Sequence, residues 1–144
     1  MGTWRASPEP GAPGASRTVD VLLADDEPLF TGTLCDLLVD QGYAVTTASD
    51  GMSAVHLTRC YRPAIVFLDL AVPGIGGEDA CRLILAEPDP PRVVILTAHA
   101  TEEQVRRLLT SGATAVLVKP IPSEQILRLL GEACQARAVA AYSA

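Results

Sequence analysis

Five polar residues of this 144-residue chain follow short apolar runs and have side chains that could do chemistry together. They are Asp25, Asp26, Asp69, Thr97 and Lys119. Carboxylates brought to one edge of a sheet repel one another and raise each other's pKa unless a cation lies among them. Oxygen ligands without histidine or thiolate favour Mg²⁺, or Mn²⁺ in its place. The pattern therefore predicts a carboxylate cluster that holds a hard divalent cation.

Asp69 is the candidate nucleophile of this cluster. Residues 70–77, which follow it, are rich in Pro and Gly and could wrap a ligand closely. A carboxylate beside a metal can attack phosphorus and form an acyl phosphate. Thr97 offers a hydroxyl donor, and Lys119, the only lysine of the chain, offers a compact ammonium. Both groups suit the equatorial oxygens of a transferred phosphoryl group.

Each of these residues also has a purely structural explanation. Asp25 and Asp26 could be an N-cap pair favoured by the helix dipole, and Asp69 could cap the following loop. Thr97 could be the N-cap of the fourth helix, and Lys119 could simply be solvated. Their joint placement after four of the five apolar runs favours a shared site over separate structural roles.

Apolar runs alternate with stretches of helical periodicity from residue 19 onward. The runs are VDVLLA (19–24), AVTTA (44–48), AIVFL (64–68), RVVIL (92–96) and AVLV (115–118). Such near-continuous β-branched runs are typical of strands buried on both faces, and the alternation is typical of βαβ units. We predict an α/β fold, a five-stranded parallel sheet with helices on both faces. Ligands of such sheets bind beyond the carboxyl ends of the strands, where the candidate residues lie.

The segments between the runs carry apolar stripes at helical spacing. The stripes are Phe30, Leu34, Leu37 and Leu38, then Val105, Leu108 and Leu109, and last Ile126, Leu129, Leu130 and Ala133. Ser123 is the expected N-cap of the last helix, and Gly42 and Gly112 are expected to end helices. The proline-rich segment 87–91 predicts a loop into the fourth strand.

Composition narrows the class of protein. With 49% hydrophobic and 19% charged residues the chain reads as a soluble globular protein, and its net charge of −6 argues against direct nucleic-acid binding. No leader and no membrane-spanning run is visible. The four cysteines lie far apart, with no C-x-x-C pair and no histidine at ligand spacing, which favours free thiols in a reducing cytosol. We therefore expect a cytoplasmic protein without membrane contact.

We predict three segments. Residues 1–18 are expected to be a flexible tail rich in Pro, Gly and Ala, with Trp4, the only tryptophan, inside it. Residues 19–136 are expected to form the domain, and residues 137–144 a C-terminal tail.

The segments LLADDE (22–27), LDLAVPGIGGED (68–79), ILTA (95–98) and GATAVLVKP (112–120) resemble the receiver domains of bacterial response regulators. The resemblance covers about residues 19–134. It implies a flavodoxin-like (βα)5 fold with strand order 2-1-3-4-5. It also implies two-component signalling, with Mg²⁺-dependent phosphorylation of Asp69 by a sensor histidine kinase or a histidine phosphotransfer protein.

The same resemblance assigns roles to site residues. The implied metal ligands are Asp26, Asp69 and the backbone carbonyl of Ala71, with Asp25 bound through water. The implied phosphoryl ligands are Thr97, the Ala98 N–H and Lys119. The Lys119–Pro120 bond is expected to be cis. Val116 stands where the family usually carries an aromatic residue that rotates on activation.

By this resemblance the chain is not a turnover enzyme: it catalyses only its own phosphorylation and dephosphorylation and switches a surface that binds a downstream protein. A phosphorylation-linked homodimer is compatible with that role. Alternatives are a pseudo-receiver scaffold that signals without phosphorylation, an aspartyl-nucleophile phosphohydrolase, and a flavodoxin-like nucleotide or flavin binder. Haloacid-dehalogenase-like phosphatases carry a second Asp two residues after the nucleophile, where this chain has Ala71, and no Gly-rich loop follows the first strand. The sequence leaves open whether the receiver stands alone or was cut from a longer regulator.

Overall fold

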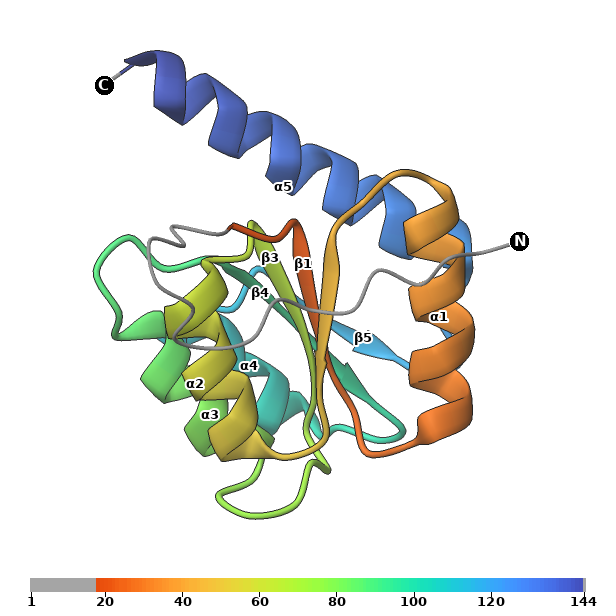
Figure 1. Cartoon of the computed structure of the whole chain (residues 1–144). Helices are drawn as coiled ribbons and strands as arrows, with labels where there is room; N and C mark the ends of the chain where they lie inside the picture. Colours follow the sequence, from red (N-terminus) through yellow and green to blue (C-terminus); the bar gives the residue numbers. More distant parts are fainter. Residues whose placement is uncertain (1–17, 144) are drawn as a thin grey trace.

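A computed structural model of the chain describes residues 18–143, and within them strands and helices alternate (Figure 1). The strands are β1 (Val21–Ala24), β2 (Val45–Ala48), β3 (Ile65–Asp69), β4 (Arg92–Thr97) and β5 (Ala115–Val118). The helices are α1 (Pro28–Asp40), α2 (Gly51–Tyr61), α3 (Gly77–Leu85), α4 (Glu102–Ser111) and α5 (Ser123–Ser143). Trp4 and all but the last residue of the expected N-terminal tail lie outside the described residues.

The five strands form one parallel sheet in the order β2-β1-β3-β4-β5, which confirms the expected topology. Register aligns the strand ends: Asp69 pairs with Leu96, and Thr97 pairs with Val118. Because all strands run the same way, the residues that follow β1, β3, β4 and β5 meet at one edge. This edge is called the carboxyl edge below, and the opposite one the amino edge.

Helices cover both faces of the sheet, as expected. Figure 1 shows α2, α3 and α4 on one face and α1 and α5 on the other. Neighbouring strand residues point to opposite faces, so Leu22 packs with Ile84 of α3 while Leu23 packs with Leu38 of α1 and Leu130 of α5. Two apolar layers therefore fix the sheet, and with it the carboxyl edge.

The helix α5 differs from its expected form at both ends. Ser123 is its first residue rather than its N-cap, because the carbonyl of Pro122 accepts the first hydrogen bonds of the helix. The segment 137–144, expected as a tail, is helical as far as Ser143, so residue 136 does not end an element. The alanine-rich sequence after Ala133 favours helix, and Figure 1 shows α5 running past the amino edge of the sheet.

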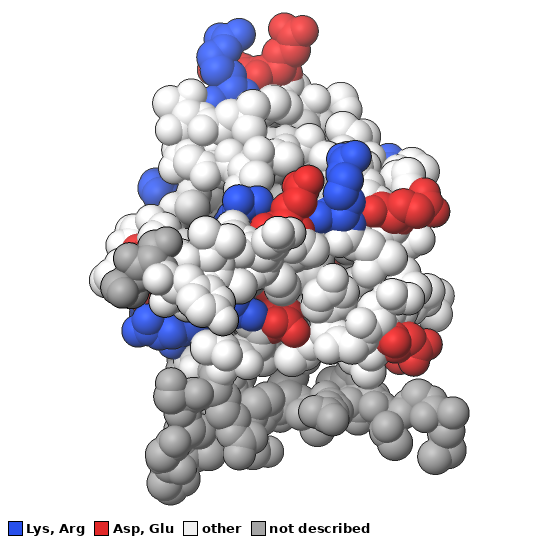
Figure 2. Space-filling view, turned by 90° about the horizontal axis from the view of Figure 1, so that it is seen from above, with Lys and Arg blue, Asp and Glu red and all other residues white. Residues whose placement is uncertain are grey.

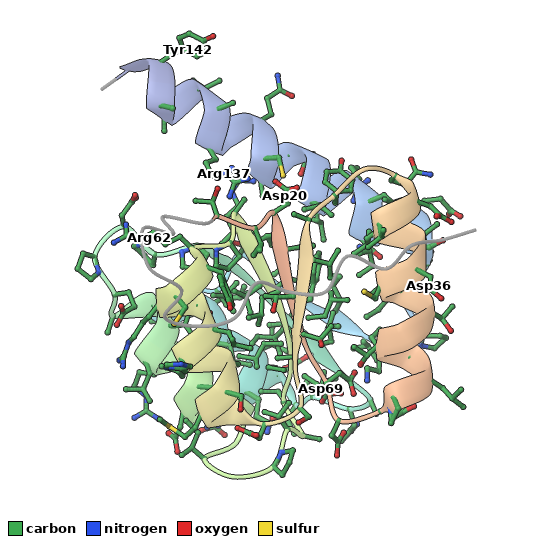
Figure 3. All side chains as sticks on the ribbon, in the orientation of Figure 1. Asp20, Asp36, Arg62, Asp69, Arg137 and Tyr142 are labelled. Atoms are coloured by element: carbon green, nitrogen blue, oxygen red, sulfur yellow. The ribbon has the colours of Figure 1, made fainter. Side chains whose placement is uncertain are left out.

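Arg137 fastens this extension to the sheet. Its guanidinium donates to the carbonyl of Val19 at 2.8 Å and to the carboxylate of Asp20 at 2.6 Å. Figure 3 shows the two labelled side chains, Arg137 and Asp20, facing each other between α5 and β1.

In the fourth helix, α4, Leu109 was expected in the core stripe but is 45% exposed, so Leu108 alone of that pair is buried.

Charge on the face at the amino edge is mixed. Figure 2 views the molecule from the side of α5 and the amino edge, and the basic and acidic side chains of the described residues alternate there. None of the helices between residues 18 and 143 combines the length with the hydrophobicity that a membrane span requires.

Candidate functional site

Four strands deliver the candidate residues to the carboxyl edge. Asp25 follows β1, Asp69 ends β3, Thr97 ends β4 and Lys119 follows β5. In Figure 3 Asp69 lies at the end of the sheet opposite to Asp20 and Arg137. The expected cis Lys119–Pro120 peptide bond is present.

Lys119 joins two of the three carboxylates. Its Nζ lies 2.7 Å from Oδ2 of Asp25 and 2.6 Å from Oδ2 of Asp69. The side chains of Asp25 and Asp69 are only 2% and 8% exposed, and that of Lys119 is 18% exposed. An ammonium with two buried carboxylate partners is not a solvated surface lysine, so that alternative for Lys119 is wrong.

The second oxygen of each buried carboxylate is held by the backbone. Oδ1 of Asp25 accepts from the N–H of Glu27 at 2.9 Å, and Oδ1 of Asp69 accepts from the N–H of Ala71 at 2.7 Å. The N-cap of α1 is Glu27, so Asp25 and Asp26 are not the N-cap pair of that helix. Both carboxylates are thus fixed in direction by one amide and one ammonium.

Burial and charge shift two pKa values in this cluster. Burial raises the pKa of Asp25, the hydrogen bonds from Lys119 and Glu27 oppose that rise, and the negative charge of Asp69 adds to it. Burial acts to lower the pKa of Lys119, but its hydrogen bonds to Asp25 and Asp69 outweigh burial and raise it. The two carboxylates thus favour the charged form of Lys119, whereas the surroundings of Asp25 on balance disfavour its charged form.

Phe30 is a site residue that the sequence analysis assigned only to the core. The ammonium of Lys119 lies 4.7 Å from the centre of the Phe30 ring, within the range of a cation–π contact. Phe30 belongs to the first turn of α1, which starts at Pro28, two residues after Asp26. Its position close to the carboxyl edge was the one sequence feature that could have indicated a role in the site. The helical spacing of Phe30 is equally well explained by a core position.

Thr97 lies at the same edge, but its contacts are local. Its buried hydroxyl donates to the carbonyl of His99 at 2.8 Å and accepts from the N–H of His99 at 3.1 Å. The N-cap of α4 is Thr101, whose side chain forms a capping box with Gln104, so the explanation of Thr97 as that cap is wrong. The hydroxyl is thus held by the backbone of the loop after β4, at the same edge of the sheet as the carboxylate pair.

Asp26 and Ala71 are exposed beside this cluster. Within residues 18–143 no three His, Cys, Asp or Glu side chains converge closely enough to hold a metal ion together. The structure thus brings Asp25, Asp69 and Lys119 together and leaves Asp26 turned to solvent. The donors are nevertheless all oxygen, two buried carboxylates with a third adjacent in the chain, and this chemistry fits a hard cation.

Comparisons with known proteins agree with this arrangement. The family described as response regulator receiver domain matches residues 21–131. The transcriptional regulatory protein PdtaR of Mycobacterium tuberculosis is 35% identical over 74% of this chain and 52% of its own length. The DNA-binding response regulator MtrA of Mycolicibacterium smegmatis is 36% identical over 76% of this chain and 48% of its own length. The chain spans about half the length of these curated relatives.

Solved structures give the same result. The signal receiver domain of a putative LuxO repressor protein from Vibrio parahaemolyticus superposes with a TM-score of 0.75 at 26% identity, covering 85% of this chain and 97% of that one. The receiver domain of the sensor histidine kinase PA1611 from Pseudomonas aeruginosa, which has a magnesium ion coordinated in its active site cleft, gives 0.70 at 27% identity, covering 80% and 96%. The chain therefore belongs to the response regulator receiver domain family of two-component signalling.

Proposed function

We propose that Asp69 accepts a phosphoryl group from the phosphohistidine of a sensor histidine kinase or a histidine phosphotransfer protein. The observation that carries the proposal is the bridge from Lys119 to both Asp69 and Asp25. It places a fixed positive charge beside the only buried carboxylate that ends a strand of the described sheet. A carboxylate held in this way is oriented for attack and its surroundings are ready to receive added negative charge.

The transfer forms one bond and breaks one. A carboxylate oxygen of Asp69 bonds to phosphorus, the P–N bond to the partner's histidine breaks, and the bonding pair leaves with the imidazole. The ammonium of Lys119 then balances the charge of the phosphoryl oxygens, and the hydroxyl of Thr97 donates to one of them. The backbone N–H of Ala71 holds the other oxygen of Asp69 in place, and the Ala98 N–H is a further donor to the phosphoryl group.

The metal ligands in this proposal are Asp25, Asp26, Asp69 and the backbone carbonyl of Ala71. A Mg²⁺ ion bound there, or Mn²⁺ in its place, would neutralise charge that develops on the phosphoryl oxygens. The support is the all-oxygen donor set and the raised pKa of Asp25, whose charged form is disfavoured by burial and by the charge of Asp69. Lys119 alone does not offset two buried carboxylates.

The output we propose is a changed protein-binding surface rather than turnover of a substrate. Thr97 connects the site to that surface, because its hydroxyl must leave the carbonyl of His99 to donate to a phosphoryl oxygen. Val116, half-buried in β5, takes the place of the switch aromatic. The downstream target is a protein, with a phosphorylation-linked homodimer as one form, and we propose no direct nucleic-acid contact. We further propose that the signalling unit begins at residue 19 and includes α5 as far as Ser143, and that its location is the cytoplasm.

The test is the intact mass of the chain after incubation with acetyl phosphate and Mg²⁺. We expect one phosphoryl group, lost in alkali, that is absent without metal and absent in Asp69→Asn. Asp36→Asn is the matched control, because Asp36 is an exposed aspartate on the outer side of α1 (Figure 3) and should leave the adduct unchanged.

An adduct that persists in Asp69→Asn would contradict the assignment of the acceptor. If the wild-type chain gains no mass, beryllofluoride binding separates the remaining cases. Mg²⁺-dependent binding of beryllofluoride would mean a short-lived acyl phosphate, whereas no binding would favour a pseudo-receiver that signals without phosphorylation.

A further inference from the structure

The outer surface of α2 carries a cysteine and a histidine in direct contact. Sγ of Cys60 lies 3.6 Å from Nε2 of His56, one helical turn earlier. His56 is exposed and Cys60 is partly exposed. The expectation that no histidine stands at ligand spacing from a cysteine is therefore wrong, because an i, i+4 pair lies on one face of a helix.

We propose that Cys60 and His56 form a chelating site for a thiophilic divalent metal ion of the Zn²⁺ type. Zinc binds thiolate sulfur at about 2.3 Å and imidazole nitrogen at about 2.0–2.1 Å, and a tetrahedral angle between them puts the two donors about 3.6 Å apart. The two donors of this pair already have that separation. Paired zinc ligands four residues apart on a helix are an established arrangement, since the spacing directs both at one ion.

Metal entry replaces one proton. In the metal-free chain the thiol and the imidazole share a hydrogen bond. Binding forms one bond from sulfur and one from Nε2 to the ion, and the thiol proton leaves to the solvent. Within residues 18–143 no third His, Cys, Asp or Glu side chain joins the pair, so water completes the coordination.

The pair is separate from the carboxylate cluster in both place and chemistry. The helix α2 begins near the carboxyl edge and ends at the amino edge, and Cys60 is its second-to-last residue. A soft thiolate with an imidazole selects zinc-like ions, whereas the carboxylates at Asp69 select Mg²⁺. The neighbouring guanidinium of Arg59 is paired with Glu87 at 2.9 Å, so its positive charge is compensated.

The composition of the chain makes the site easy to isolate. The sequence contains two histidines and four cysteines, all within the described residues. Cys35 and Cys81 are buried, and the thiol of Cys134 contacts the carboxylate of Asp20 instead of an imidazole. His99 lies in the loop after β4.

The test is a Co²⁺ titration of the reduced, full-length chain with excess Mg²⁺ present, followed by the near-ultraviolet band of thiolate-to-cobalt charge transfer. Carboxylate ligands give no such band, so Co²⁺ at the acidic cluster stays silent. We expect the band in the wild-type chain, its loss in Cys60→Ser and its displacement by Zn²⁺. In His56→Gln the affinity should fall by at least about 10-fold, since loss of even an outer-shell partner costs about 10–100-fold.

The matched controls are Cys134→Ser and His99→Gln, which should keep the wild-type band and affinity. Far-ultraviolet circular dichroism shows whether each variant is folded. No band in the wild-type chain, or a band that survives in Cys60→Ser, overturns the proposal. Equal Co²⁺ affinity of His56→Gln and wild type also overturns it, because the ion would then be bound adventitiously by the thiolate alone and not chelated by both residues. Phosphorylation of Asp69 is not involved in any of these readouts.

Discussion

Gly77 lies against Leu70 with no space for a side chain between them. A Cβ at position 77 would lie 2.5 Å from Cα of Leu70 and 2.6 Å from the carbonyl oxygen of Asp69. The N–H of Gly77 also donates to the carbonyl of Leu70 at 3.1 Å. This contact closes the loop between the candidate acceptor and α3, because the first residue of α3 packs directly on the backbone of Asp69 and Leu70.

Gly77→Ala should therefore disturb both stability and the site. The clash is with backbone atoms, which cannot rotate away, and such overpacking costs about 1–3 kcal/mol. We expect a lower free energy of unfolding in urea and slower phosphorylation by acetyl phosphate. Gly32→Ala is the control, because Gly32 lies exposed in α1 with nothing within 4 Å. There the change should stabilise by about 0.5–1 kcal/mol. Wild-type stability and phosphorylation in Gly77→Ala would contradict this account of the loop.

Asp25→Asn should stabilise the metal-free chain at neutral pH while weakening its response to Mg²⁺. The pKa of Asp25 is raised above 3.8 in the fold, first by burial, so between the unfolded and the folded pKa the folded state holds a proton that the unfolded state has lost. The free energy of unfolding falls as pH rises through this range, and Asn removes that loss. The advantage of the variant should vanish below about pH 4. Thermal unfolding across pH, in chelator and without it, measures the effect.

Addition of Mg²⁺ should make the wild-type chain more stable than Asp25→Asn, the reverse of the ranking without metal. An ion at 100 times its Kd stabilises a folded protein by about 2.7 kcal/mol. We expect this gain in wild type and a smaller one in Asp25→Asn. Equal Mg²⁺ stabilisation of both chains would exclude Asp25 from the metal site.

Lys119→Met should lower the free energy of unfolding at neutral pH, and part of that loss should be recovered at acidic pH. Without the ammonium, Asp25 and Asp69 face each other as buried carboxylates, and loss of a hydrogen bond to a charged group costs about 1.5–3 kcal/mol. Protonation of Asp25 relieves that repulsion, so we expect part of the lost stability to return as the pH is lowered. Urea denaturation at several pH values checks this, and a variant with no loss at neutral pH would be inconsistent with the bridge.

The wild-type chain should lose stability at alkaline pH, where the Lys119 ammonium is deprotonated. The pKa of Lys119 is raised in the fold by its two carboxylate partners, which outweigh burial. Its contribution is therefore complete below the unfolded value of about 10.4 and disappears as pH rises through the folded pKa. Lys119→Met should lack this alkaline step.

Arg137→Gln should loosen the end of α5. Arg137 joins the helix to the carbonyl of Val19 and to Asp20, and both partners directly precede β1. Since the Arg137 side chain is 37% exposed, we expect a cost of only about 1 kcal/mol. Amide exchange of residues 138–143 should become faster, with the core strands unchanged. Arg128→Gln, at an exposed position of the same helix, is the control. Unchanged exchange in Arg137→Gln would show that alanine propensity alone maintains the extension.

The sequence by itself determined the sheet and the strand ends. Each strand is a local apolar run between turn-forming residues, so its position can be recognised without knowing its partners. Parallel strands align their ends, and Asp25, Asp69, Thr97 and Lys119 consequently had to share an edge. The strand order came from the family resemblance, and the pairing of β1 with both β2 and β3 confirms it.

Only the tertiary structure decided which of these residues touch. The bridge from Lys119 spans 94 residues to Asp25 and 50 residues to Asp69, and no local pattern encodes side-chain directions over such distances. The same holds for Phe30 under the ammonium and for Arg137 on Asp20. Burial also distinguishes the two aspartates of the acidic pair. It raises the pKa of Asp25, whereas the adjacent Asp26 is exposed to solvent. Adjacent residues of one motif thus acquired different chemistry from their packing, which depends on the whole fold.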